Sequence, residues 1–556
     1  MTFPDWLGRI RIPTVAICLC VTQAAFAQDT GVIAGRVRDS TSGNPRSGAV
    51  VTVVGSGARG STGADGRFVL AQVPAGPKQV QVRAIGFLPA ISDVIVRAGE
   101  TTRVEIRLAA NPVTLRTIRV AAAPTERDEF TNAPNVGAVT LSTRAVQVVP
   151  RFGEADVARA VQLAPGIEAR NDYSTGFNVH GGESDQNLIL IDNYPIYNPF
   201  HLGGLFSTFV GSTVRDVRLL TGSIPAQFGG RLSSVMDVRS AEEPREGLHG
   251  GAEVSVLAAT ASLGSAFGNQ RGSWNVAARR TYADQLVDWF SEDRLPYHFR
   301  DEQGHLSFQL TPTVDLAVTV YDGRDVMDGS FSEVGDSSKA HAGGGAFFFS
   351  WGNLVAGGSV SKAFGRTLLG DSGRAEQRLS TSRFSTQLDL GSGSLAVQNS
   401  LDDVRLSGTI TALSSAGSRM IGYDVDRFAI DYSTLAGRAS IDPVISHQSP
   451  TGAGVFYDQL WKPSSRLIVE GGLRAEAMTG RDYKSLSPRF SAKWLTGPSS
   501  AITIGAGRYT QWIHSTTLED DPILLFDYWR ASDSVTPVSS AWQYVLGHER
   551  WLAGER

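Results

Sequence analysis

Residues 247–556 alternate between apolar and polar side chains with a period of two in one segment after another. In residues 305–310 every second residue is Leu or Phe, and residues 383–390, 466–477 and 489–494 repeat the pattern. Successive side chains of a strand point to opposite faces, so this period predicts strands with one apolar and one polar face. Short turns alternate with longer polar connections, which is typical of an antiparallel transmembrane β-barrel. A soluble sandwich with a polar outer face gives the same alternation.

The N-terminus has the features of a secretory signal. Arg9 and Arg11 precede the short apolar stretch Val15–Val21, and Ala25-Phe26-Ala27 supplies a small-x-small cleavage pattern. We therefore expect residues 1–27 to be a signal peptide. The alternative is a membrane anchor, which requires about 20 apolar residues.

Composition narrows the possible chemistry. The net charge of −4 at pH 7 gives no support for nucleic-acid binding. Both cysteines, Cys18 and Cys20, lie within the expected signal, so the mature chain has no disulfide or zinc–thiolate site. The nine histidines are scattered, and neither a metal nor a cofactor is expected. A secreted chain without an apolar helix can still enter a membrane as a closed barrel, because backbone groups in lipid must pair internally.

Residues 28–110 are predicted to form a small β-sandwich. The turn at residues 62–66, the Arg67-Phe68 pair and Pro74-Ala75-Gly76 resemble the carboxypeptidase-regulatory-like, or transthyretin-like, domain. That resemblance implies a structural or interaction module without an active site. The expected strands, separated by turn clusters, are residues 32–37, 50–54, 68–73, 79–82 and 104–108.

Residues 137–240 contain two strand–turn units that are dense in Gly and Pro. The first covers residues 187–202 with a turn at Asp192-Asn193, and the second covers residues 214–238. These units resemble the signature segments of the plug domain of TonB-dependent outer-membrane receptors. The family usually has Gly second in that turn, and Asn is the next-best residue at positive φ, so we expect the turn to persist.

A helix is expected at the start of the plug, at about residues 154–163, ending before Pro165-Gly166. The resemblance also implies an α+β plug followed by an antiparallel transmembrane barrel over residues 247–556, in which Arg279-Arg280-Thr281-Tyr282 matches a run seen early in such barrels. Four small apolar residues form one face of the expected helix: Val157, Ala160, Val161 and Ala164.

The linker, residues 111–136, is rich in Ala, Pro, Thr and Asn. A segment within it resembles the TonB box, which binds a periplasmic partner by adding a strand to a sheet edge. The alternative is a plain linker or the last strand of the preceding domain. The candidate residues are Thr117, Ile118, Arg119, Val120 and Ala121.

The resemblance implies a receptor in the cell outer membrane that imports a ferric siderophore, cobalamin, an oligosaccharide or a peptide. Its partners would be a TonB-type periplasmic energy transducer, outer-membrane lipid, an extracellular solute and, as a further candidate, a surface lipoprotein. By family position, five plug residues are candidates for solute contact, with plug packing as the alternative: Tyr194, Tyr197, Asn198, Phe200 and His201.

Plugged transporters have about 22 strands, whereas the alternation supplies only about 12 to 14 strands of spanning length. The chain also ends at Arg556 rather than on an aromatic residue. The expectation is therefore an incomplete barrel from a C-terminally truncated receptor.

Two motifs fit enzymes, but neither is complete. His180 and Glu183 match the His-x-x-Glu of zinc carboxypeptidases, yet a zinc site needs a third ligand. Ser372 lies in a Gly-Asp-Ser-Gly run like that of chymotrypsin-like proteases, yet no protease-like His segment precedes it. We expect no enzyme. A secreted β-domain adhesion or scaffold protein is the alternative, and it predicts a water-soluble chain.

Overall fold

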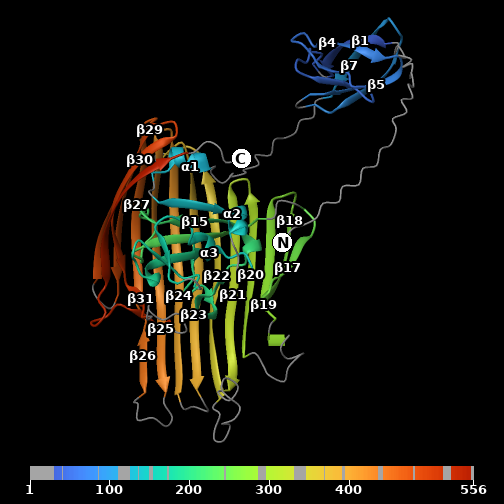
Figure 1. Ribbon diagram of the computed structural model, residues 1–556. Helices are drawn as coiled ribbons and strands as arrows, with labels where there is room; N and C mark the ends of the chain where they lie inside the picture. The colour runs from blue at the N-terminus through green and yellow to red at the C-terminus, as the bar shows by residue number, and fades with distance from the viewer. Residues whose placement is uncertain are drawn as a thin grey trace, which may run out of the picture. The chain divides into compact units, whose positions relative to one another are not determined.

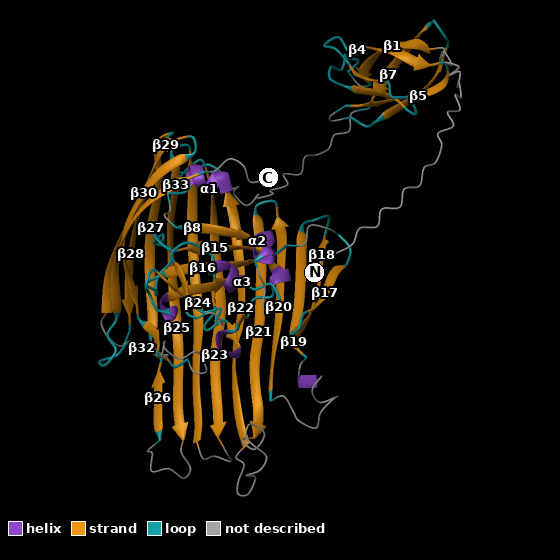
Figure 2. Cartoon of the chain, viewed as in Figure 1, coloured by secondary structure: helices purple, strands orange, loops and turns teal. Residues whose placement is uncertain are grey.

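The computed structural model describes residues 30–40, 42–84, 87–109, 126–134, 137–149, 154–171, 174–242, 246–282, 284–285, 296–330, 346–367, 370–390, 395–435, 443–479, 483–516 and 527–551. The chain divides into two compact units, Met1–Ala123 and Pro124–Arg556. The expected signal peptide and the TonB-box candidate lie outside the described residues. Figures 1 and 2 show the elements of both units.

The first unit consists of a three-stranded and a four-stranded sheet that share one apolar core. Ile33, Val51 and Leu108 are fully buried there. All five expected strands are confirmed, and two strands were missed, because β3 is a three-residue Arg-Gly-Ser segment and β6 turns Ile91 and Ile95 outward. The strands are β1 (Thr30–Asp39), β2 (Val50–Val53), β3 (Arg59–Ser61), β4 (Arg67–Pro74), β5 (Gly76–Arg83), β6 (Ala90–Val96) and β7 (Thr101–Leu108).

The plug is built on a five-stranded mixed sheet of order β12-β11-β16-β15-β8. Its strands β11 and β16 are parallel, and every residue of β11 is buried, which explains the continuous apolar run Leu188–Ile191. The strands of this sheet are β8 (Ala138–Ser142), β11 (Asn187–Ile191), β12 (Tyr194–Pro195), β15 (Val214–Leu220) and β16 (Ser234–Ser240).

The turn between β11 and β12 has the expected conformation. Asp192 and Asn193 have φ of 50° and 67°, which is the type I′ geometry that matches strand twist. The Asp192 carboxylate also accepts hydrogen bonds from the amide and hydroxyl of Ser240, at 2.8 and 2.6 Å. The hairpin is therefore fixed to the next strand of the sheet.

The helix expected at about residues 154–163 is shorter in the structure: α3 spans only Val157–Val161. Asp156 caps it through the Arg159 amide at 3.0 Å, and its second oxygen accepts from the Ser207 amide at 2.6 Å, which keeps the preceding residues extended. The predicted apolar face is confirmed, because all four of its residues are buried.

The remaining plug elements are short turns and bridges. No helix among the described residues is long and apolar enough to cross a membrane. The helices are α1 (Glu126–Asn132), α2 (Thr143–Val148), η1 (Ser184–Gln186), η2 (Leu202–Gly204) and η3 (Gly211–Thr213), and the short strands are β9 (Ile167–Ala169), β10 (Phe177–Val179), β13 (Phe200–His201), β14 (Phe206–Ser207), β31 (Ile513–Ser515) and β32 (Trp529–Ala531).

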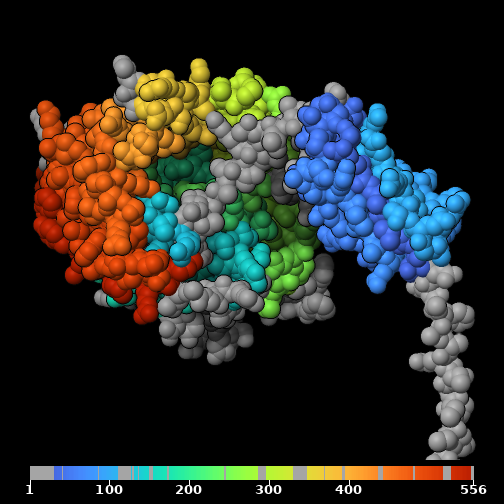
Figure 3. Space-filling model, turned by 90° about the horizontal axis from the view of Figure 1, so that it is seen from above, coloured from blue at the N-terminus to red at the C-terminus, as the bar shows by residue number. Residues whose placement is uncertain are grey.

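A single 15-stranded antiparallel sheet curves around the plug (Figure 3), and among the described residues its two end strands, β17 and β33, do not pair with each other. Sequential strands pair in order from β17 to β33, and β26 pairs with β25. The strands are β17 (His249–Val254), β18 (Ala258–Phe267), β19 (Gly272–Thr281), β20 (Tyr297–Thr311), β21 (Val314–Ser330), β22 (Ala346–Phe364), β23 (Ser372–Leu390), β24 (Leu395–Ser414), β25 (Gly417–Leu435), β26 (Val444–Gln448), β27 (Thr451–Ser464), β28 (Leu467–Met478), β29 (Tyr483–Gly497), β30 (Ser500–Gln511) and β33 (Ser539–Arg550).

The two faces of this sheet differ in chemistry, as the alternation predicted. Polar and charged side chains such as Asp301, Arg474 and Glu476 are buried inside it. Large apolar side chains are exposed on the opposite face, among them Leu306, Val318, Val320, Leu354, Val404, Leu406, Ile421 and Leu473. The longest strands exceed the roughly 9–11 residues that a strand needs to cross a membrane. β24, for example, has 20 residues.

Two glycines of the first unit, Gly66 and Gly43, allow a matched test of how the turns of this unit are packed. Gly66 has φ +75°, and an added Cβ would lie 2.6 Å from the Val37 carbonyl oxygen, whereas Gly43 has φ +69° and open space around it. Gly43→Ala therefore meets only the left-handed backbone penalty, roughly 1 kcal/mol. Gly66→Ala adds a backbone clash, and we expect a loss of about 3 kcal/mol. Thermal unfolding of residues 28–110 measures both, and equal melting temperatures would contradict the packing.

Candidate functional site

The five solute-contact candidates lie in one plug segment, residues 194–201, that follows the barrel wall. Tyr194 packs against Gly357 of β22, where an added Cβ would stand 2.5 Å from the tyrosine ring. The Asn198 carbonyl accepts a hydrogen bond from Asn353 Nδ2 at 3.1 Å. This part of the plug is therefore seated on the wall through both packing and backbone hydrogen bonds.

The other three candidates also contact the wall. The Tyr197 hydroxyl donates to Asp403 Oδ2 at 2.9 Å, and the Phe200 carbonyl accepts from Trp351 Nε1 at 3.3 Å. Four of the five candidates, including His201, are no more than 7 % exposed. The structure brings all five together at the interface, and their contact with a solute stays a prediction.

His201 is paired with two aspartates of the wall. Its Nε2 lies 2.8 Å from Asp301 Oδ1, its Nδ1 lies 2.6 Å from Asp325 Oδ2, and its ring stacks on Phe299 with centroids 4.1 Å apart. Two carboxylates are both satisfied when both ring nitrogens donate, which is the protonated imidazole. Burial by itself lowers the pKa of His201, but Asp301 and Asp325 outweigh it and raise this pKa to about 9.

Arg279, the first residue of the Arg-Arg-Thr-Tyr run, extends this cluster. Its guanidinium lies 2.7 Å from Asp301 and 3.1 Å from Glu154, and it donates to the Ser207 carbonyl at 2.8 Å. Tyr321 donates to Asp301 at 2.6 Å. Wall strands β19 to β21 are thereby joined to two separate plug segments through buried charges.

A second group of wall residues binds the backbone of the plug loop at residues 223–230. Asp458 accepts from two successive loop amides at 3.0 and 3.2 Å. Arg489 donates to two successive loop carbonyls, at 3.0 Å for that of Ile224, and the Tyr509 hydroxyl accepts from the Ile224 amide at 3.1 Å. The wall therefore recognises this loop mainly by its main chain.

Arg474 of β28 lies beneath the same loop. It pairs with both carboxylate oxygens of Asp424 at 2.7 and 2.8 Å and with Glu476 at 2.5 Å, and its side chain is 1 % exposed. A Cβ at Gly229 would lie 2.3 Å from Arg474 Nε, so a side chain at this position would have to displace the Arg474 guanidinium. The alternation of residues 466–477 fits either a barrel or a soluble sandwich with its polar face in water, and the structure buries Arg474 and Glu476 on the face of the sheet that meets the plug.

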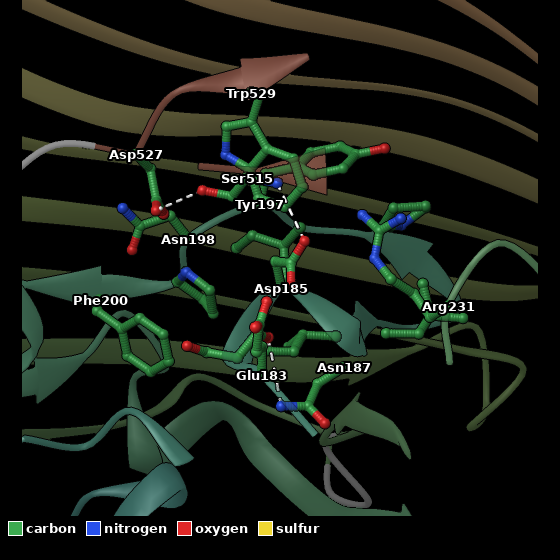
Figure 4. Close-up of a pocket in the computed structure, with 16 residues that line it drawn as sticks. Glu183, Asp185, Asn187, Tyr197, Asn198, Phe200, Arg231, Ser515, Asp527 and Trp529 are labelled. Atoms are coloured by element: carbon green, nitrogen blue, oxygen red, sulfur yellow. Dashed lines mark hydrogen bonds between the residues drawn. The ribbon is translucent and has the colours of Figure 1, made fainter. Parts of the chain in front are cut away.

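A pocket lies between the plug and the connection from β30 to β33 (Figure 4). The Ser515 amide donates to Asp185 at 3.1 Å, and its hydroxyl donates to Asp527 at 2.8 Å. Arg231 lies over the ring of Trp529, 5.4 Å from its centroid. Sequence reasoning missed Asp185, Arg231 and Trp529, because no local pattern relates the two plug residues to a tryptophan that lies far along the chain.

The enzyme-like motifs gain no support from their surroundings. His180 has φ +51° beside Gly166, and no group of three side chains that could hold a metal ion occurs in the part of the chain that the structure describes. Ser372 is exposed at the start of β23, where it pairs with Leu413 of β24. Both motifs are thus local turn and strand features.

An inner domain held by buried charges against a curved antiparallel sheet is the arrangement of a plugged barrel. Two family models match the chain. The carboxypeptidase regulatory-like domain matches residues 32–109, and the TonB-dependent receptor plug domain matches residues 138–234. No curated protein matches the chain.

Solved structures give the same result at low sequence identity. The siderophore receptor PirA from Acinetobacter baumannii is 12 % identical, with 77 % of this chain and 70 % of that chain covered at a TM-score of 0.55. PirA from Pseudomonas aeruginosa is 15 % identical, with 75 % and 72 % covered and a TM-score of 0.53. The outer membrane transporter YddB from Escherichia coli is 11 % identical, with 67 % and 61 % covered and a TM-score of 0.50.

The chain therefore has the fold and the plug domain of TonB-dependent receptors, preceded by a carboxypeptidase regulatory-like domain. Proteins of this class are receptors and transporters rather than enzymes.

The His201 cluster predicts a specific pH dependence. The pKa of His201 is about 9 when folded and about 6.5 when unfolded, so its stabilisation is complete below pH 6.5 and is lost as pH rises through 9. We expect the melting temperature of the detergent-solubilised protein to fall over this range. His201→Gln should melt lower at pH 6.5 and lack this fall.

The matched control is His447→Gln, which removes an exposed histidine paired with Asp431 at 2.6 Å. It should keep the wild-type profile. An unchanged fall in His201→Gln would mean that another group is responsible.

Proposed function

We propose that the protein is an outer-membrane receptor that imports a scarce or bulky solute with energy from a TonB-type periplasmic transducer. The observation that carries this proposal is the plug inside the barrel, bound to the wall through His201, Arg279 and Arg489. A solute can pass only when these contacts are displaced. The candidate solute classes are a ferric siderophore, cobalamin, an oligosaccharide and a peptide.

Displacement of the plug requires energy, because breaking a buried pair leaves an uncompensated charge at a cost of about 3–5 kcal/mol. The described plug strand closest in sequence to the linker is β8, and among the described residues it is an edge strand that pairs only with β15. A pull on the linker would therefore act first on the hydrogen bonds between β8 and β15. The candidate box at residues 117–121 is the attachment point that this mechanism requires.

Location in a lipid bilayer is supported by the outer face of the barrel. Its exposed Leu, Val and Ile side chains form the apolar surface that lipid requires, and Trp461 and Trp494 are exposed near strand ends. In a secreted adhesion protein these apolar side chains would be exposed to water. A surface lipoprotein as an additional partner stays a prediction.

The membrane location predicts an asymmetric response to one substitution. Val404, near the middle of β24, is 48 % exposed on the outer face, and Val69 of the first unit is 66 % exposed. Val404→Arg places a charge in the bilayer at about 2–4 kcal/mol, so less protein should be recovered folded from the membrane fraction. Val69→Arg should leave recovery unchanged, and equal recovery of both variants, with the protein soluble without detergent, would favour the adhesion alternative.

The box assignment predicts a defined binding partner. A peptide of residues 113–124 should bind the periplasmic domain of a TonB-type protein from the source organism by strand addition. Val120→Pro removes a backbone donor and fixes φ, so binding should fall at least tenfold in titration calorimetry. Val120→Ile keeps the β-branched side chain and should bind like the wild type. Equal binding by the proline peptide would place the box elsewhere.

A further inference from the structure

The pocket beside the plug contains polar atoms that the protein leaves without partners. Asp185 Oδ2 accepts from the Ser515 amide at 3.1 Å and from Gln511 Nε2 at 2.9 Å, but Asp185 Oδ1 has no hydrogen-bond partner among the described residues, although its side chain is only 9 % exposed. Trp529 Nε1 is likewise without a described acceptor, at 5 % exposure. Buried polar atoms are nearly always paired with protein, water or another group, so Asp185 Oδ1 is open to a donor that enters the pocket, whereas the Trp529 N–H requires an acceptor.

The charges around the pocket are mostly negative. Glu183, Asp185 and Asp527 line it against the single guanidinium of Arg231. Burial, the largest effect, raises the pKa of Asp185 to about 6 although Arg231 opposes it, so this carboxylate is ionised at neutral pH. His514 also faces Asp185 at 4.0 Å, and burial lowers the pKa of His514 to about 4, which leaves its imidazole neutral.

The aromatic rings that line the pocket already contact each other and Arg231. Trp529 is packed edge-on against Tyr197 with centroids 5.3 Å apart, and Arg231 lies over both rings at 5.4 and 5.9 Å. A sugar ring that stacks on Trp529 would therefore have to compete with these contacts. An anionic siderophore would meet the carboxylates, which repel it.

The size of the pocket limits which cationic group it can enclose. The cavity volume is about 50 Å³, far below the roughly 300–1,000 Å³ of sites that enclose a whole ligand. A cavity of about 10–15 Å³ is enough for one water molecule, so this pocket has room for a few groups of the size of water or a primary ammonium. The pocket can thus enclose one ammonium group while the rest of a solute lies outside it.

We propose that this pocket is the recognition site for a primary ammonium group of the imported solute, such as an amine-bearing peptide, with Asp185 Oδ1 as the acceptor. The inference rests on the proposed import function and narrows its solute class. One wall of the pocket belongs to the connection between β30 and β33, so the site lies on the rim opposite the short turns at residues 415–416, 465–466 and 498–499.

Binding of trilysine to the purified full chain in detergent at pH 7.5 tests the proposal by titration calorimetry. Trilysine with all amines acetylated is the matched ligand, because acetylation removes the charges and keeps the backbone. We expect saturable binding of trilysine that weakens with salt, and at least tenfold weaker binding of the acetylated peptide. Equal binding of both peptides, no binding of either, or saturable binding of maltotriose alone would overturn the proposal.

Variants locate the site. Asp185→Asn should weaken trilysine binding at least tenfold, and Asp65→Asn, which removes an equally charged residue from the first unit, should leave it unchanged. If Asp185→Asn fails to fold, Glu183→Gln provides a second variant at an exposed pocket residue, with a smaller loss expected. Wild-type affinity in both pocket variants would overturn the assignment. The assay needs neither a membrane nor a transducer, so its failure leaves the import proposal untouched.

Discussion

Several charged side chains of the barrel wall are removed from water at places where the plug supplies their partners. Asp301 and Asp325 share the His201 imidazole, and Arg489 is matched by carbonyls of the plug loop. Each group would carry a large desolvation cost if its partner moved away. Wall and plug therefore depend on each other: the lumen tolerates its buried charges because the plug is seated, and the plug is seated because these charges need it.

Because of this dependence, displacing the plug from the wall costs free energy, and the plug acts as a barrier to passage. The wall binds the 223–230 loop mainly through its main chain, and at Gly229 a side chain would have to displace the Arg474 guanidinium. Release of the loop exposes several charges at once, so partial movement gains little. A mechanical input through the linker fits this arrangement, since force on an edge strand breaks hydrogen bonds one after another.

The pocket near Asp185 differs in one physical respect from the charged clusters around His201 and Arg474. In the clusters around His201 and Arg474, carboxylates are matched by cations of the protein itself. In the pocket, carboxylates outnumber cations and one buried oxygen has no described partner. The clusters around His201 and Arg474 therefore stabilise the contact between plug and wall, whereas the pocket is suited to a positive charge of a bound solute.

Much of the structure could be predicted from patterns among residues that are close together in the sequence. The period of two placed the barrel strands and their apolar faces, Asp192-Asn193 fixed a type I′ hairpin, and the small apolar face of α3 was visible in Val157 to Ala164. These features depend on neighbouring residues, whose geometry the backbone dictates. The length of α3 was wrong in the prediction, because Asp156 is also bound by the distant Ser207 amide. Tertiary structure alone decided that Arg474 faces the lumen and that Asp185 meets Trp529, since a charge on a polar strand face has the same pattern whether water or a plug covers it.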